Sequence, residues 1–377
     1  MLLTPELIEY RDTVRARAAE RIGPFVDVLD REQRFSPEVW AEVRDLELFG
    51  LPFPSAVGGL DGSFLAFTVA TEAVARTSAS AALYPGTTVQ VAATLLRHGT
   101  PAQVERWVPT MVRGDAPVAW AFTEPQTGSD PKQLQTTAVP DGDGWRLNGQ
   151  KLFISYARQA QVAVVFARTP GGSVGAFIVR TDTPGWATGT PFELLAMGGG
   201  EPAPIYLDDV HVPGDQLIGA ADEGFQAMIA GEAQGKIRAA AICVGIAQRA
   251  IDEAATYALQ RTHRGQSIAT KFPTIQGLLG EMEASTLAAR ALVHHAAELI
   301  DRGGDVAREA AAARVVAGRA AREVTSAAMQ VCGAYGLTRE LPLERLYREG
   351  KFFEVAQGVA EIQRAIVARH VIADHAG

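Results

Sequence analysis

A short polar segment offers groups that could hold a ligand. Residues 120–130 read WAFTEPQTGSD, in which a strand-like start leads into a loop with proline, glycine and hydroxyl side chains. Backbone amides and hydroxyls in such a loop can converge on the oxygens of an anionic or heteroaromatic ligand. A plain polar β-turn is the alternative interpretation of the same residues.

Helices and strands must position this loop, and the periodicity along the chain changes twice. Helix start signals at Thr4-Pro5, Ser36-Pro37 and Thr100-Pro101 place a capping hydroxyl before a proline at the first helical position. Apolar helical runs follow over residues 65–80 and 87–98.

Strands are predicted between residues 118 and 219, where residues 162–166 alternate with period two and residues 176–179 form a short apolar run. Long alanine-rich helices then cover residues 227–261, 274–301 and 306–334. These patterns predict an α+β multidomain fold. We expect an N-terminal all-α domain, a middle antiparallel, barrel-like β-domain and a C-terminal four-helix bundle, with the bounds 1–117, 118–222 and 223–377.

Composition narrows the classes of function. The net charge of −8 argues against a nucleic-acid or anionic-membrane partner. No apolar run is long enough to span a membrane and residues 1–20 do not resemble a signal peptide, so we expect a soluble, cytoplasmic protein. Cys243 and Cys332 lie in apolar helical stretches and are predicted to be buried thiols. No metal site is expected, because the adjacent His294 and His295 would project about 100° apart on a helix.

Five ordered motifs resemble the acyl-CoA dehydrogenase family. The loop at residues 120–130 is similar to the family signature Thr-Glu-Pro, three residues, then Ser-Asp. The others are NGQKLFIS at 148–155, LDDVHVP at 207–213, YALQR at 257–261 followed by Gly265, and QVCGAYG at 330–336 with RLYR at 345–348. Together they extend from residue 120 to residue 348, over more than half of the chain.

This resemblance implies FAD as the cofactor. It places Phe122, Thr123 and Ser155 at the isoalloxazine ring and Phe153 against the face of that ring, while Ser129, in the same loop as Gly128, reaches the pyrophosphate. A second set would meet the FAD of a neighbouring subunit, which implies an oligomer, either a dimer or a tetramer. This set comprises Arg261, Gln330, Gly333 and Ala334. A guanidinium suits a pyrophosphate because its donors form a fixed fork.

The expected catalytic carboxylate is missing. In the family, a glutamate in a Tyr-Glu-Gly-Thr stretch removes the α-proton of an acyl thioester while hydride leaves the β-carbon for the flavin. This chain has Gln357 at that place, and an amide cannot accept a proton at neutral pH. The alternative family position for the base is Gly235, before Lys236. Two carboxylates lie nearby in sequence, Glu232 and Glu354, each with a structural role as the alternative.

Three functions remain open on these residues. The first is α,β-dehydrogenation of an acyl thioester, carried by CoA or an acyl carrier protein, with a displaced base such as Glu232 and with electron-transfer flavoprotein or another acceptor. The second is a subunit without a base in a mixed tetramer with an active relative. The third is a flavin enzyme that has turned to oxygen chemistry.

Overall fold

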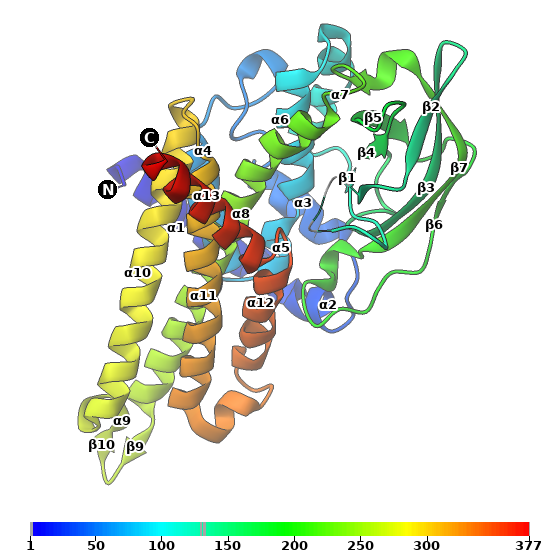
Figure 1. The fold of residues 1–377 in the computed structure, drawn as a ribbon. Helices are drawn as coiled ribbons and strands as arrows, with labels where there is room; N and C mark the ends of the chain where they lie inside the picture. The colour runs from blue at the N-terminus through cyan, green and yellow to red at the C-terminus, as the bar shows by residue number, and fades with distance from the viewer. Residues whose placement is uncertain (1–2, 129, 131–132, 377) are drawn as a thin grey trace.

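The chain folds into an N-terminal helical part, a β-sheet and a C-terminal helical bundle, as the two changes in periodicity predict (Figure 1). The computed structural model describes residues 3–128, 130 and 133–376. None of the helices in these ranges combines the length and apolarity needed to cross a membrane.

The N-terminal part consists of short helices whose starts follow the predicted signals. They are α1 (Pro5–Arg21), α2 (Val26–Asp30), α3 (Pro37–Asp45), α4 (Phe64–Ala75), α5 (Ala79–Leu83), α6 (Gly86–His98) and α7 (Pro101–Val112). The hydroxyls of Thr4, Ser36 and Thr100 each accept a backbone N–H of the first turn, which confirms three predicted N-caps.

The helical run predicted over residues 65–80 is interrupted in the structure. The first helix, α4, ends at Ala75 and α5 starts at Ala79. Ser78 has an extended backbone and its hydroxyl accepts the amide of Ala81. A serine at this position favours a new N-cap over helix continuation, because its side chain competes for backbone donors.

The sheet is mostly antiparallel. Its strands are β1 (Val118–Ala121), β2 (Thr137–Asp141), β3 (Gly144–Ile154), β4 (Val162–Arg168), β5 (Val174–Arg180), β6 (Trp186–Thr188), β7 (Ala203–Pro213) and β8 (Leu217–Ile218). The order is β6-β7-β3-β2-β4-β5-β8, and β1 pairs with β4 in parallel. The polar loop that follows β1 meets the end of β3, where the Leu152 amide donates to the carbonyl of Thr123.

Long helices form the C-terminal bundle. After the sheet come α8 (Gly224–Gln260), the small hairpin of β9 (Thr262–His263) and β10 (Gln266–Ser267), α9 (Ile268–Lys271), α10 (Pro273–Asp301), α11 (Ala307–Cys332), α12 (Leu343–Val355) and α13 (Ala360–His375). Many alanines of α8 and α11 are fully buried, and their small side chains let the helix axes approach closely. Cys243 and Cys332 are buried and unpaired thiols, as predicted.

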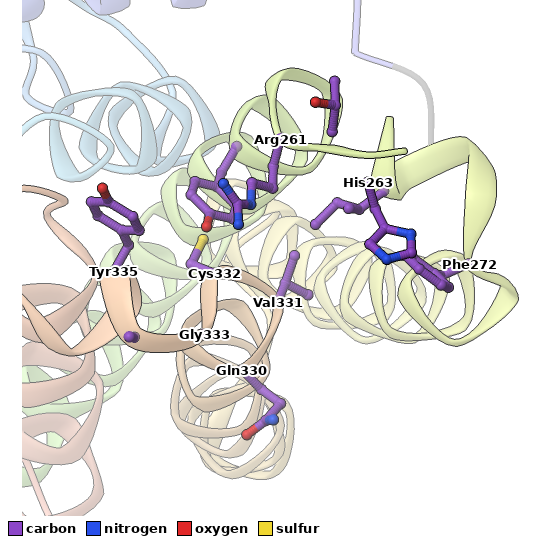
Figure 2. Close-up of a pocket in the computed structure, with 12 residues that line it drawn as sticks. Arg261, His263, Phe272, Gln330, Val331, Cys332, Gly333 and Tyr335 are labelled. Atoms are coloured by element: carbon purple, nitrogen blue, oxygen red, sulfur yellow. The ribbon is translucent and has the colours of Figure 1, made fainter. Parts of the chain in front are cut away.

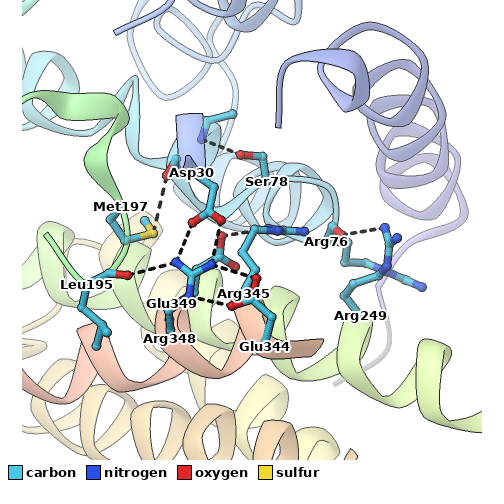
Figure 3. A network of polar contacts seen from close by, with 12 residues as sticks. Asp30, Arg76, Ser78, Leu195, Met197, Arg249, Glu344, Arg345, Arg348 and Glu349 are labelled. Carbon is cyan, nitrogen blue, oxygen red and sulfur yellow. Dashed lines mark hydrogen bonds and ion pairs between the residues drawn. The ribbon is translucent and has the colours of Figure 1, made fainter. Parts of the chain in front are cut away.

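Arg348 fastens α12 to two other parts of the molecule (Figure 3). Its guanidinium donates two hydrogen bonds of 2.7 Å to the carboxylate of Asp30 on α2, and one of 3.0 Å to the carbonyl of Leu195. The carboxylates of Asp30 and Glu344 raise the pKa of Arg348. This bidentate contact joins the N-terminal helices, the segment before β7 and the bundle.

Candidate functional site

The segments after β1 and at the end of β3 lie side by side. Leu152 donates its amide to the carbonyl of Thr123 at 2.8 Å, so Phe122 and Thr123 lie next to Phe153 and Ser155. These four residues, predicted from distant parts of the sequence, therefore lie on two neighbouring segments, which together offer one candidate surface for a ligand. Gly128 lies in the same loop, and Ser129 falls outside the described residues.

Phe153 presents an aromatic ring to the surface. Its backbone has a positive φ of 55°, an uncommon conformation for a non-glycine residue, and the residue is 54% exposed. The ring lies 4.5 Å from that of Phe192, centroid to centroid. An exposed aromatic ring supported in this way can pack against the face of a flat heteroaromatic ligand.

A buried ion pair that the sequence did not reveal supports this surface. The ammonium of Lys151 lies 2.7 Å from the carboxylate of Glu124 and also donates to the carbonyls of Phe122 and Phe166. The Glu124 carboxylate accepts the amides of Gln135 and Thr136. Burial lowers the pKa of Lys151 to about 8, and Glu124 opposes this shift. A lysine at an inward position of a strand is the only sequence signal of this pair.

The second predicted set meets at the far end of the bundle. Arg261, Gln330, Gly333 and Ala334 line one cavity of about 390 Å³ at the junction of α8, α11 and the β9–β10 hairpin. Figure 2 shows the Arg261 side chain beside Cys332, whereas the side chain of Gln330 points away from it. Gly333 has a φ of 57° and a ψ of −134°, a conformation that glycine adopts with ease.

These two sets of residues are far apart within one chain. The first belongs to the β-sheet and the second to the hairpin end of the bundle, on the opposite side of the molecule (Figure 1). One ligand cannot contact both sets of the same chain.

Gln357 and Gly235, the two positions at which the family carries its base, lie next to each other in the structure. Gln357 lies in the turn between α12 and α13 with a φ of 57°. A Cβ added to Gly235 would be 3.3 Å from Gln357 Oε1 and 3.5 Å from Gln90 Oε1. Gln357, Gly235 and Gln90 thus surround one point between α6, α8 and the α12–α13 turn.

Glu232 is the carboxylate nearest to this point along α8. It precedes Gly235 by three residues, so both lie on one face of a helix that already starts at Gly224. Burial raises the pKa of the Glu232 carboxyl, while Lys236, Gln90 and Arg238 oppose the shift. The Gln90 amide nitrogen is buried without a hydrogen-bond partner among the described residues.

Glu354 has a different environment. Its carboxylate oxygens lie 2.7 Å from Arg322 Nε and 2.7 Å from Lys351 Nζ. Partial burial opposes ionisation, but these two cations outweigh it and lower the pKa of Glu354. A carboxylate held by two cations is a poor proton acceptor.

Helices α6 and α8 contact each other through glycines that face polar residues. A Cβ on Gly231 would lie 3.1 Å from Thr94 Oγ1, and a Cβ on Gly86 would lie 1.6 Å from Arg238 Nη1. With the contact of Gly235 and Gln90 there are three such pairs. Their residue numbers rise along α6 and fall along α8, so the two helices are antiparallel. Sequence reasoning missed Gln90, Thr94 and Arg238, because nothing local links α6 to α8; the glycines four residues apart on α8 were the only available signal.

Comparison with known proteins identifies the class. The N-terminal, middle and C-terminal domain families of acyl-CoA dehydrogenase match residues 4–115, 119–210 and 222–372, and the chain belongs to the acyl-CoA dehydrogenase family of FAD-dependent oxidoreductases.

Similar proteins match over nearly their full length. The chain is 34% identical to a probable acyl-CoA dehydrogenase, YngJ, of Bacillus subtilis, with 98% of this chain and 99% of that protein covered. It superimposes on butyryl-CoA dehydrogenase from Megasphaera elsdenii with a TM-score of 0.95, 29% identity and 99% coverage of both chains. It is also similar to the prolyl acyl carrier protein oxidase AnaB, with a TM-score of 0.93, 25% identity, and 98% and 100% coverage.

Proposed function

We propose that the protein oxidises an acyl thioester to its α,β-unsaturated form, with Glu232 as the proton acceptor. The observation that carries this proposal is the desolvated Glu232 carboxyl, one helical turn from the contact of Gly235 with Gln357. A general base works best when its pKa lies near the working pH, and burial moves the pKa of Glu232 in that direction.

The residues present fit FAD. Phe122, Thr123, Phe153 and Ser155 would hold the flavin ring, because they combine an exposed aromatic face with backbone and hydroxyl donors on one surface. When bound, FAD supplies a hydride acceptor. Glu124, the carboxylate beneath this surface, is paired with Lys151, and we propose that the acceptor for the proton lies on the helices.

The distance between the two sets of cofactor residues favours an oligomer. The cavity at Arg261 and Gly333 would take the pyrophosphate and adenine side of the FAD held by a neighbouring subunit. The guanidinium of Arg261 presents donors for phosphate oxygens, and Gly333 leaves room beside the backbone. We therefore propose a homo-oligomer in which each cofactor contacts two chains.

The chain's own groups then divide the work. The Glu232 carboxylate would take the α-proton as the α C–H bond breaks. The β-hydrogen would leave with the electron pair of its C–H bond, for which bound FAD would supply the hydride acceptor. Gln357 and Gln90 are amides that can donate hydrogen bonds but cannot accept this proton. Electron-transfer flavoprotein is a suitable final acceptor, and the thioester is carried by CoA or by an acyl carrier protein, the carrier in the name of the similar AnaB.

Gln357 favours a second candidate, a subunit without a base in a mixed tetramer. In that assembly the chain would contribute only its cavity at Arg261 to the FAD of an active partner. Co-purification with a second family member, and activity only in the mixture, would support this candidate.

An anaerobic titration of the purified flavoprotein with a panel of acyl thioesters tests the proposal. Loss of the oxidised flavin absorbance with at least one thioester is expected. A flavoprotein that no CoA thioester and no carrier-bound thioester reduces, alone or after reconstitution, would contradict it. Fast reoxidation by oxygen with a hydroxylated product would instead support oxygen chemistry.

A further inference from the structure

Arg238 is a buried cation without a partner. It is 3% exposed, and its guanidinium makes no hydrogen bond or ion pair with any described residue. The other buried Lys and Arg residues in the described ranges are all engaged: Lys151 with Glu124, Arg314 with the carbonyl of Ala356, and Arg345 with Glu349. An isolated buried charge is costly, so its persistence calls for an anion.

The guanidinium lies against the first residue of α6. A Cβ on Gly86 would be 1.6 Å from Nη1 and 2.1 Å from Cζ of Arg238, so only glycine leaves room for it. Burial lowers the pKa of Arg238 to about 10, and the group is still cationic at neutral pH. Tyr156 and Glu232 are the titratable groups that act on it, and neither forms a hydrogen bond or an ion pair with it.

This end of α6 also lacks a cap. Pro85 precedes the helix and provides no side-chain hydrogen bond. The amides of Gly86, Thr87 and Thr88 donate to no described residue, and the hydroxyls of both threonines are buried without partners. A buried helix start normally has its amides satisfied, and its partial positive charge repels a neighbouring guanidinium.

All of these groups can donate hydrogen bonds, and none of them has an acceptor partner among the residues that the structure describes. A guanidinium, three free amides at a helix N-terminus and two hydroxyls together make a binding site for an anion with two oxygens, such as a carboxylate. The buried Arg238 thus indicates an anionic ligand. The uncapped start of α6 independently indicates an anion at the same place.

The site formed by Arg238 and the start of α6 lies a short distance from the place where the thioester would react. Gly86 precedes Gln90 by four residues on α6, and Arg238 follows Gly235 by three on α8, so the donors lie about 4.5–6 Å along the helices from the point between Gly235 and Gln357. That point is where the thioester end of the substrate reacts if the proposed function holds.

We propose that Arg238 and the start of α6 bind a carboxylate at the far end of the acyl group. The substrate is then the monothioester of a dicarboxylic acid, with about five to seven carbons by the helical spacing. This proposal rests on the proposed function for the thioester end, but the carboxylate site can be tested without turnover.

The test compares matched pairs of CoA thioesters on the flavoprotein with its cofactor. Glutaryl-CoA is paired with pentanoyl-CoA and adipyl-CoA with hexanoyl-CoA, and the dissociation constant is measured anaerobically by calorimetry beside the rate of flavin reduction. We expect the dicarboxylic member to bind about 10- to 100-fold more tightly, as hydrogen bonds to a charged group do. Arg238→Met should remove this preference and leave the monocarboxylic thioesters as good or better.

A control and a second variant keep the test decisive. Arg249→Met, also on α8 but paired with Glu253, should leave the preference unchanged. Arg238→Lys keeps the charge but loses the forked donors, so it should keep only part of the preference for the dicarboxylic thioester. The lysine variant takes the place of Arg238→Met in the test if the methionine protein does not fold.

The outcomes separate the two proposals. Arg238-dependent binding of dicarboxylic thioesters without flavin reduction would support the carboxylate site and contradict the proposed oxidation. Reduction by both members of each pair with equal affinity would support the oxidation and overturn the carboxylate site. Arg238-dependent stabilisation by chloride or phosphate, with no preference among thioesters, would assign the site to a free ion and also overturn it.

Discussion

Glu232→Gln is expected to abolish most of the reductive chemistry while leaving the site intact. Glutamine keeps the size of the side chain and removes only the proton acceptor. No replacement base is available in the described surroundings, because Gln357 and Gln90 are amides and Glu354 is held by Arg322 and Lys351. The loss of a general base lowers a rate by about 10²–10⁴-fold, or roughly 3–5 kcal/mol.

The assay is a single anaerobic turnover followed by stopped-flow absorbance of the flavin. Glu354→Gln is the matched control, and its rate should stay within about twofold of the parent protein, since it removes a surface ion pair. Adding Gln357→Glu to Glu232→Gln should restore a large part of the rate, because it returns a carboxylate beside Gly235. A Glu232→Gln rate within about threefold of the parent protein would refute the assignment of the base.

The pH dependence has a definite sign. Because burial raises the pKa of Glu232, the rate of flavin reduction should increase with pH through a value above the ordinary 4.5 of a glutamate. The folded protein binds this proton more tightly than the unfolded chain does. Its contribution to stability is therefore complete below the ordinary pKa and is lost as the pH rises through the raised one. Glu232→Gln should remove this decline in a pH series of urea denaturation curves.

Three further predictions concern the supporting residues. Lys151→Met strands the buried Glu124 and should lower the free energy of unfolding by about 3–5 kcal/mol, whereas the double change with Glu124→Gln recovers most of it; equal losses in urea denaturation would contradict this. Gly86→Ala should destabilise by about 1–3 kcal/mol through overlap with Arg238, and much less in the Arg238→Met background; a double-mutant cycle by thermal unfolding without coupling would argue against the contact. Phe153→Ala should weaken FAD binding about three- to tenfold in a fluorescence titration of the apoprotein, and an unchanged affinity would remove this ring from the cofactor site.

Local signals in the chain were enough to predict the order helical, β, helical and three helix starts. A hydroxyl before a proline acts within one turn, and the change from helical to alternating periodicity needs no distant contact. The break between α4 and α5 was not predicted from local signals. Ser78 is compatible with a helix interior and with an N-cap, and in the structure it is the N-cap of α5.

Tertiary packing alone decided which residues share a site. Gln90, Gly235 and Gln357 come from three elements separated by more than one hundred residues of sequence, and no periodicity links them. Burial likewise separates Glu232 from Glu354, two carboxylates that composition treats alike. Burial raises the pKa of Glu232, whereas two neighbouring cations lower the pKa of Glu354. Desolvation and ion pairing depend on neighbours in space, so the chemistry of these groups could be read only from the folded chain.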